Sequence, residues 1–154
     1  MDSYSIDIEN KKKYSIDYLT ALLFTSIPEW VRLLLKLRDF IVKPFGLETG
    51  IIPESKNIDS SLHYDRGDRA IFFHVINRTT SEIVMAEDDK HLYFRTSLLV
   101  RNKSKPNIQS LYLTTLIQFH NIFGKMYFMP VKPFHKLIMK RLLIKLSKNI
   151  SIDE

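Results

Sequence analysis

The 154-residue chain contains no cysteine. That absence excludes a disulfide framework, a thiolate nucleophile and any metal site built from cysteine. Glycine is scarce as well, with four residues in all, and the sequence holds no glycine-rich phosphate loop, Walker motif or serine–histidine–acid signature. Nucleotide-dependent chemistry is therefore not expected, and we expect neither a cofactor nor a bound metal.

Long hydrophobic runs are also missing. The longest apolar stretch, residues 18–42, is interrupted by one proline and five charged side chains, which argues against a membrane-spanning helix. The opening "MDSYSIDIENKKK" places acids before its lysines and has no apolar core, unlike a secretory signal. We therefore expect a cytoplasmic protein. Its net charge of +6 allows contact with anionic partners.

What the sequence does contain is the composition of a globular domain. Hydrophobic residues make up 45% and charged residues 26%, and a chain of this length can bury a substantial core. We expect one domain over residues 1–154, with a flexible tail at residues 148–154.

The N-terminal third alternates between strand and helix signals. Residues 4–8 alternate as a strand does, and Asp17 is suited to cap a short helix over residues 18–24. Pro28 then opens a second helix, which ends near Pro44. One face of this second helix is apolar and is expected to be buried, through Trp30, Leu33, Leu34, Leu37, Phe40 and Ile41. Residues 48–69 are predicted to form a loop.

The remainder predicts an antiparallel meander followed by a long helix. Residues 70–76, 82–86, 91–100 and 110–120 are strand-like runs joined by short polar connections. From residue 121 the period becomes helical, and one apolar face carries Phe134, Leu137, Ile138, Leu142 and Leu146. The order of elements predicts an α+β domain in which the long helix lies against a curved antiparallel sheet.

The stretch "EDDKHLYFRTSLLV", residues 87–100, gathers three acids, a histidine and an arginine beside an alternating apolar row. Burying the apolar rows of both strands fixes one register. It pairs Leu92 with Phe119, Phe94 with Ile117, Thr96 with Thr115 and Leu98 with Leu113. The same register sets His91 opposite His120.

Those two histidines leave three interpretations open. The favoured one is a solvated turn at "EDDK", where aspartate is at home, with two histidines beside it. A metal site would use His91, His120 and a nearby carboxylate, although no ligand-spacing motif is present. Acid–base catalysis by the same pair is the third.

Three blocks of the sequence carry a family resemblance: "FTSIPEWVRLLLKLRDFIVKPFGL", "EDDKHLYFRTS" and "HNIFGKMYFMPVKPFHKLI". Together they resemble the bacterial domain of unknown function 2867 (DUF2867) over about residues 4–146. The resemblance implies a helix-grip fold of the START/SRPBCC superfamily, also called birch-pollen-allergen-like, with a cavity between the sheet and the C-terminal helix. The family has no established activity, and similar domains occur fused to nicotinamide-dependent reductase domains. The extra Pro130, just before Pro133, bears on the start and straightness of the last helix.

On that fold, the expected ligand-binding residues come from two layers. The sheet contributes Phe94, Thr96, Leu98, Leu113, Thr115, Ile117 and Phe119, and the helix contributes Met126, Tyr127, Met129, Phe134 and Ile138. Small-molecule sites are mostly apolar with a few placed polar groups. The same residues would equally form a plain packed core. His135 is a candidate base or hydrogen-bond donor at the mouth of the cavity, or an anchor between the helix and a neighbouring loop.

The function expected from these residues is binding of a hydrophobic or amphipathic small molecule. One alternative is a small cyclase- or hydrolase-like enzyme that uses Tyr127, His135 or the His91 and His120 pair. Another is a protein-interaction module with a reductase-like partner. The last helix is also basic, through Lys132, Lys136, Lys140, Arg141, Lys145 and Lys148, which allows weak contact with an anionic surface. Nucleic acid is not expected, because no stacking-aromatic motif is present.

Overall fold

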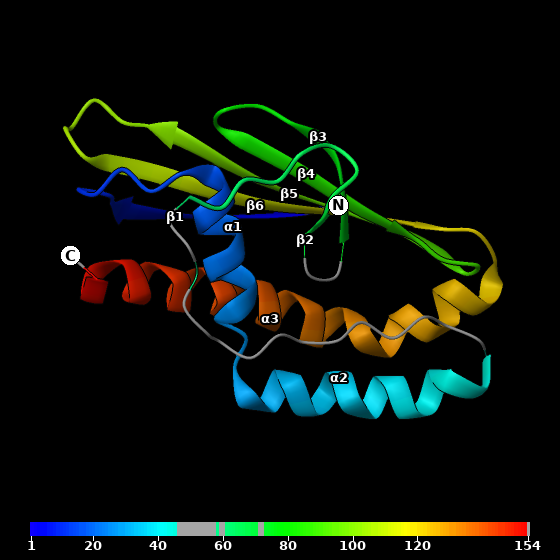
Figure 1. Ribbon diagram of the computed structural model, residues 1–154. Helices are drawn as coiled ribbons and strands as arrows, with labels where there is room; N and C mark the ends of the chain where they lie inside the picture. The colour runs from blue at the N-terminus through cyan, green and yellow to red at the C-terminus, as the bar shows by residue number, and fades with distance from the viewer. Residues whose placement is uncertain (46–57, 59–60, 71–72, 154) are drawn as a thin grey trace.

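The computed structural model describes residues 1–45, 58, 61–70 and 73–153. It contains a six-stranded antiparallel sheet in the order β1-β6-β5-β4-β3-β2 (Figure 1). The strands are β1 (Asp2–Glu9), β2 (Arg69–Ala70), β3 (Phe73–Arg78), β4 (Glu82–Asp88), β5 (Leu92–Asn102) and β6 (Ile108–Phe119). The helices are α1 (Ile16–Thr25), α2 (Glu29–Val42) and α3 (Ile122–Asp153), with a short 3-10 turn at Lys43–Phe45. The predicted α+β class is therefore confirmed.

The helices form a layer on one side of the sheet. In Figure 1, α3 runs beneath the sheet and α2 runs alongside α3, on its far side from the strands. The core lies between α1, α3 and the sheet, and its fully buried side chains include Leu19, Leu23, Leu98, Leu113 and Leu146. A sheet with one apolar face must cover that face, and here helices from both ends of the chain do so.

The predicted hairpin register is confirmed at all four pairs. Leu92 lies opposite Phe119, Phe94 opposite Ile117, Thr96 opposite Thr115 and Leu98 opposite Leu113. The reason is the period of two along a strand: a slip of one residue would move the apolar row of β5 to the outer face. Leu98 and Leu113 are both buried, at 0% and 1% exposed, so such a slip would expose core side chains.

The run predicted as one strand at residues 70–76 is divided. Residue 70 ends β2 and residue 73 begins β3, and these two strands pair with each other, Arg69 opposite His74 and Ala70 opposite Phe73. Residues 71 and 72 lie outside the described part. β3 then pairs with β4 through an irregularity between Val75 and Asn77. The apolar run at residues 70–76 therefore contains parts of two antiparallel strands, which its continuous pattern did not indicate.

The first helix starts earlier than predicted. Ser15 is its N-cap, and the Ser15 hydroxyl accepts a hydrogen bond from the backbone N–H of Tyr18 at 3.1 Å. Asp17, expected as the cap, instead lies inside the first turn and is buried at 3% exposed. A buried carboxylate requires partners, so Asp17 has a role beyond capping.

The second helix forms where predicted, but the side expected to be buried is exposed. Leu33, Leu37 and Phe40 are 68%, 53% and 79% exposed, and Trp30 is 38% exposed. The helix packs through Val31, which is 2% exposed, and through the half-buried Leu35, whereas Leu34 is the one half-buried member of the expected set. The side chain of Ile41 lies outside the described part. Helical periodicity located the apolar side correctly, but among the described residues most of that side is exposed.

The last helix continues through both of its prolines. Pro130 and Pro133 lie within α3, whose axis bends in that segment (Figure 1), as expected where proline removes a backbone donor. Of the predicted buried face, Leu142 and Leu146 lie in the core and Ile138 packs against it, whereas Phe134 and Leu137 are 52% and 44% exposed. Because of the bend and of the buried positions toward its C-terminus, α3 turns a different set of side chains toward the sheet than the sequence predicted.

Residues 148–153 belong to α3 rather than to a flexible tail. The helix extends to Asp153, and Ile150 is completely buried in the core. Burial of a large aliphatic side chain keeps this segment on the domain. No single helix among the described residues is long and apolar enough to cross a membrane; Ile16–Thr25 and Glu29–Leu37 meet that criterion only jointly, as a pair bent by 74°.

Replacing Ile150 by alanine tests this end of the helix. The side chain is fully buried, so Ile150→Ala should lower the free energy of unfolding by about 2 to 5 kcal/mol. Ile152→Ala is the matched control, because Ile152 is 80% exposed two residues away. Urea unfolding measures both. Equal stability of the two variants would contradict the placement of Ile150 in the core.

Candidate functional site

The residues expected to line a cavity between sheet and helix fall into three groups. Thr96, Leu98, Leu113 and Thr115 are all at most 2% exposed, and Leu98 and Leu113 belong to the core. Phe94, Ile117, Tyr127 and Ile138 are half-buried, and Phe119 is 38% exposed. The layer between sheet and α3 is therefore filled by side chains toward the C-terminal half of α3, where Met139, Leu142 and Leu143 pack.

Met126, Met129 and Phe134 do not lie in that layer. They are 63%, 66% and 52% exposed, so they cannot lie between α3 and the sheet. The rings on the sheet side are Phe128, whose centroid is 5.9 Å from that of Phe119, and His135. Of the five helix residues expected to line a cavity, Tyr127 and Ile138 are half-buried and these three are exposed, because apolar side chains occur on both sides of the first half of α3.

His135 packs between aromatic rings on the sheet side of α3. Its ring meets Phe94 edge-on at a centroid distance of 5.5 Å and Phe128 at 5.8 Å. Both ring nitrogens are buried, and neither has a hydrogen-bond partner among the described residues. Burial lowers the pKa of His135, and the nearby Asp2 carboxylate opposes that shift. His135 thus anchors α3 to β5 rather than to a loop, and the catalytic roles expected of Tyr127 and His135 stay predictions.

The depressed pKa of His135 predicts how stability responds to acid. An unfolded histidine titrates near 6.5. Because the pKa is lower in the folded protein, the unfolded chain binds more protons below pH 6.5, and folding stability falls as the pH falls. His135→Leu should remove this contribution, which amounts to at most about 1.4 kcal/mol per pH unit.

Urea unfolding at about pH 8 and about pH 5.5 measures the difference. His74→Leu, at an exposed position, is the matched control and should keep the wild-type dependence. Parallel pH dependence in wild type and His135→Leu would show that His135 is not held neutral by burial.

The two hairpin histidines hold a junction between the sheet and α3. Their backbones are cross-strand neighbours as predicted, since the N–H of His120 donates to the carbonyl of His91 at 3.0 Å. Their side chains, however, have separate partners. His120 Nε2 lies 2.6 Å from Oδ1 of Asp88, and His91 Nδ1 lies 3.1 to 3.3 Å from the side-chain amide of Asn121. No group of three His, Asp or Glu side chains that could hold a metal occurs in the described part of the chain.

Asn121 and Gly124 explain why this junction has its shape. Asn121 precedes the first residue of α3, and its Oδ1 accepts from the N–H of Gly124 at 3.0 Å, as an N-cap does. Its amide also donates to the carbonyl of Lys90 at 3.1 Å. A Cβ on Gly124 would lie 2.1 Å from the carbonyl oxygen of His91, so only glycine permits this approach. The acidic, histidine-containing stretch therefore contacts the first turn of α3.

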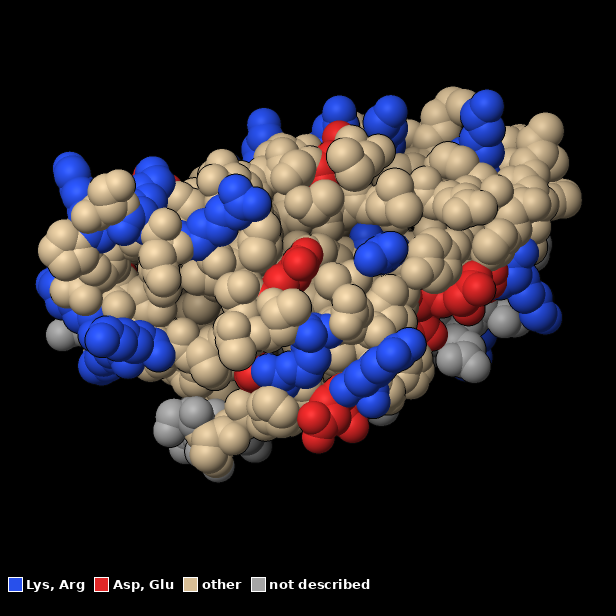
Figure 2. Space-filling view, turned by 90° about the horizontal axis from the view of Figure 1, so that it is seen from above, with Lys and Arg blue, Asp and Glu red and all other residues tan. Residues whose placement is uncertain are grey.

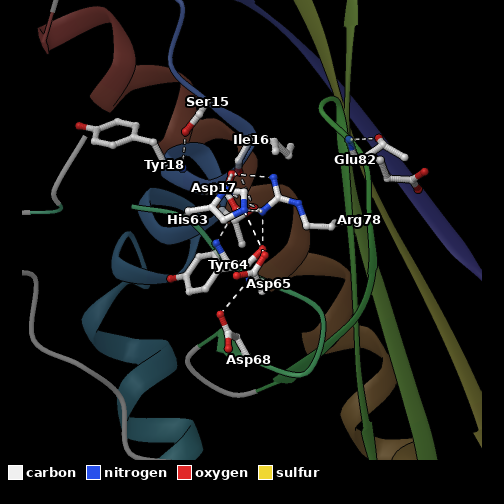
Figure 3. Close-up of polar contacts among 12 residues, drawn as sticks. Ser15, Ile16, Asp17, Tyr18, His63, Tyr64, Asp65, Asp68, Arg78 and Glu82 are labelled. Carbon is white, nitrogen blue, oxygen red and sulfur yellow. Dashed lines mark hydrogen bonds and ion pairs between the residues drawn. The ribbon is translucent and has the colours of Figure 1, made fainter. Parts of the chain in front are cut away.

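A second polar cluster surrounds Asp17 (Figure 3). Arg78, at the end of β3, donates from Nη1 to Oδ1 of Asp17 at 2.9 Å and from Nη2 to Oδ2 at 3.1 Å. The backbone N–H of Tyr64 donates to Oδ1 at 2.9 Å, and its carbonyl accepts from Arg78 Nη1. His63 lies beside the pair, with Nδ1 3.6 Å from Asp17 Oδ2 and Nε2 3.3 Å from Asp65 Oδ1. Three segments distant in sequence therefore meet at one carboxylate.

The Asp17 cluster is built for structure rather than for acid–base chemistry. The Asp17 carboxylate accepts three hydrogen bonds, two of them from the Arg78 guanidinium. These bonds stabilise its ionised form. Burial, followed by the negative charge of Asp17, raises the pKa of Tyr64. Sequence analysis missed the cluster because Asp17 matched a helix cap and Arg78 lay in a polar connection. No local pattern links residues 61 positions apart.

Removing the Asp17 charge tests how much this cluster contributes to the stability of the fold. Asp17→Asn leaves Arg78 without its buried counter-charge, so we expect a loss of about 3 to 5 kcal/mol in the free energy of unfolding. Asp65→Asn is the control, because the Asp65 side chain is 78% exposed. Thermal and urea unfolding measure both.

The double variant Asp17→Leu with Arg78→Met should be less destabilised than Asp17→Asn, since it removes both charges together. Asp17→Asn as stable as Asp65→Asn would mean that the pair contributes little to the fold.

A hollow of about 690 Å³ lies between α1, α2 and α3. α1 and the linker after it form one wall, the first turns of α2 form another, and the last turns of α3 close it. Buried Leu22 and Ile27 and half-buried Ile58 supply its apolar part. Asn149 donates to the Ser26 hydroxyl at 2.8 Å and joins α3 to the linker. Arg32 of α2 and Lys145 of α3 bring two cations to the same hollow.

The comparisons with known proteins give one match. The model of the family described as "Protein of unknown function (DUF2867)" matches residues 1–142. The chain belongs to this family. The resemblance seen in the three sequence blocks is thereby confirmed, while no curated protein and no solved structure matches the DUF2867 chain.

Proposed function

We propose that this DUF2867 protein binds a small hydrophobic or amphipathic molecule that carries an anionic group. The observation that supports it is the hollow between α1, α2 and α3, where apolar side chains adjoin cations from two different helices. The lining is mixed, because Thr25, Glu29 and Asn149 adjoin the apolar side chains and the two cations, and such a lining suits an amphipathic rather than a purely hydrophobic ligand. The apolar part of the ligand rests on Leu22 and Ile27, and its anionic group approaches Arg32 and Lys145.

The helix-grip assignment of the fold is part of the same proposal. An antiparallel sheet packed on a long C-terminal helix supports it. In a helix-grip protein the ligand lies between sheet and helix, but here Leu98, Leu113, Met139 and Leu142 fill much of that layer. The hollow between α1, α2 and α3 therefore supports ligand binding better than the layer between sheet and helix that the sequence suggested.

The contribution of Arg32 and Lys145 to the affinity for an anionic ligand can be tested directly. A hydrogen bond to a charged partner contributes about 1.5 to 3 kcal/mol. Arg32 also lies 3.6 Å from Glu29, an i,i+3 pair on α2 whose acid is 93% exposed. A ligand carboxylate competes with this solvent-screened acid for the guanidinium. The pair therefore keeps the Arg32 side chain beside the hollow.

A fluorescent fatty acid, dansyl-undecanoic acid, serves as the probe. Its fluorescence should rise on titration with the wild-type protein. The double variant Arg32→Gln with Lys145→Gln should raise its Kd about tenfold or more, because the anionic group loses both partners. Circular dichroism confirms that the variant is folded.

The matched control is the double variant Arg66→Gln with Lys105→Gln. It removes the same net charge at exposed positions outside the hollow, and it should leave the Kd unchanged. An equal loss of affinity in both double variants would mean that the probe responds only to the net positive charge of the protein. Failure of the wild type to bind the probe, or unchanged binding by Arg32→Gln with Lys145→Gln, would refute the proposed site.

A further inference from the structure

Helix α2 has apolar side chains on two opposite sides. Buried Val31 and half-buried Leu35 pack toward the core of the domain. At 3.6 residues per turn, the side of the helix opposite to these two carries a second apolar set. Its four members are exposed, and we call them the α2 seam: Trp30, Leu33, Leu37 and Phe40.

The spacing of the α2 seam is that of a contact between two helices. Its members follow one another at intervals of three, four and three residues, from 30 to 33, 33 to 37 and 37 to 40. This is the alternation of the a and d positions of a heptad, whose side chains interlock with those of a facing helix. Packing against the domain already uses Val31 and Leu35, so the α2 seam fits a helix from outside the domain.

The position of α2 in the molecule suits such a contact. In Figure 1, α2 is the element farthest from the sheet, beyond α3. Figure 2 looks down on the opposite side, the outer side of the sheet, where Lys and Arg side chains are interspersed with Asp and Glu. A contact through α2 therefore leaves the outer side of the sheet free.

We propose that two copies of this chain associate through the α2 seam, with their α2 helices antiparallel about a two-fold axis. Leu33 of each copy then lies opposite Leu37 of the other. Trp30 lies opposite Phe40 in the same alignment, because Trp30 precedes Leu33 by as many residues as Phe40 follows Leu37. Each member of the α2 seam thus meets an apolar side chain, with leucines at the centre and aromatic rings at both ends.

Charges beside the α2 seam favour a second copy in this orientation. Glu29, Lys36 and Lys43 are spaced by seven residues and flank the seam along one line. Glu29, at the start of α2, is 93% exposed, and exposed Lys43 at its end has helical backbone angles. The antiparallel arrangement brings Glu29 of each copy beside Lys43 of the other, whereas a parallel one brings each beside its own equivalent.

Two further electrostatic effects act on the pair of helices. The antiparallel arrangement opposes the two helix dipoles, so the positive end of one α2 lies beside the negative end of the other. Lys36 comes near its own equivalent at the two-fold axis, but its side chain is exposed and flexible and remains in solvent. The Glu29 and Lys43 contacts occur twice and therefore outweigh this single like-charge approach.

The size of the α2 seam determines how strong the dimer is. Four large side chains from each copy bury on the order of 1,000 Å² in total, which is at the low end for specific complexes. We therefore expect a dimer with a Kd in the micromolar range. None of the four seam residues lines the hollow, so the inference is independent of the ligand proposed there.

Sedimentation equilibrium tests the association. The wild-type protein should pass from monomer to dimer between about 1 and about 300 µM, the range that an interface of this size implies. Leu37→Asp places an acid opposite Leu33 of the other copy, twice in each dimer, and should raise the Kd by more than about tenfold. Leu37 is 53% exposed, so the monomer keeps its fold, which circular dichroism confirms.

Leu116→Asp is the matched control, because Leu116 is an exposed leucine, at 38%, that belongs to β6. This variant should dimerise as the wild type does. A wild-type protein that stays monomeric over the whole concentration range would overturn the proposal. A dimer that Leu37→Asp leaves unchanged would overturn it too, since the contact would then lie elsewhere.

The absence of cysteine permits a direct test of the orientation. Glu29→Cys and Lys43→Cys are each treated with a short bismaleimide cross-linker, alone and as an equal mixture, at concentrations where the wild type is dimeric. The antiparallel arrangement predicts cross-linked dimer in the mixture and little in either variant alone. Efficient cross-linking of each variant with itself would show a parallel pair and would contradict the proposed arrangement.

Discussion

The buried ion pair between Asp17 and Arg78 holds α1 against the sheet. It joins the first turn of α1 to the end of β3, and the Tyr64 backbone completes the cluster from a third segment. α1 carries Leu22, and the linker after it carries Ile27, so the wall of the hollow follows from where α1 is held. The three donors to this one carboxylate come from β3 and from the Tyr64 segment, so the carboxylate joins both of them to α1.

The two halves of α3 differ in how deeply their side chains are buried. Its C-terminal half buries Leu142, Leu146 and Ile150 against the core. Its N-terminal half, which contains both prolines, keeps His135 and Phe128 on the sheet side while Met126 and Phe134 are exposed.

Sequence analysis succeeded where local pattern and packing agree. The alternation along β5 and β6 has one register that buries Leu98 and Leu113, so the pairing was predictable. It failed where the answer depended on a distant neighbour. Periodicity shows that Leu33 and Leu37 share a side of α2, but not that both side chains are exposed. Likewise, nothing near Asp17 indicates an arginine 61 residues away.

Native mass spectrometry tests the central claim most directly. The protein is incubated with a total lipid extract, desalted, and measured under native and under denaturing conditions. The account predicts a native mass that exceeds the chain mass by that of one amphipathic molecule, and the excess disappears on denaturation. The bare chain mass under both conditions would contradict a ligand in the hollow between α1, α2 and α3.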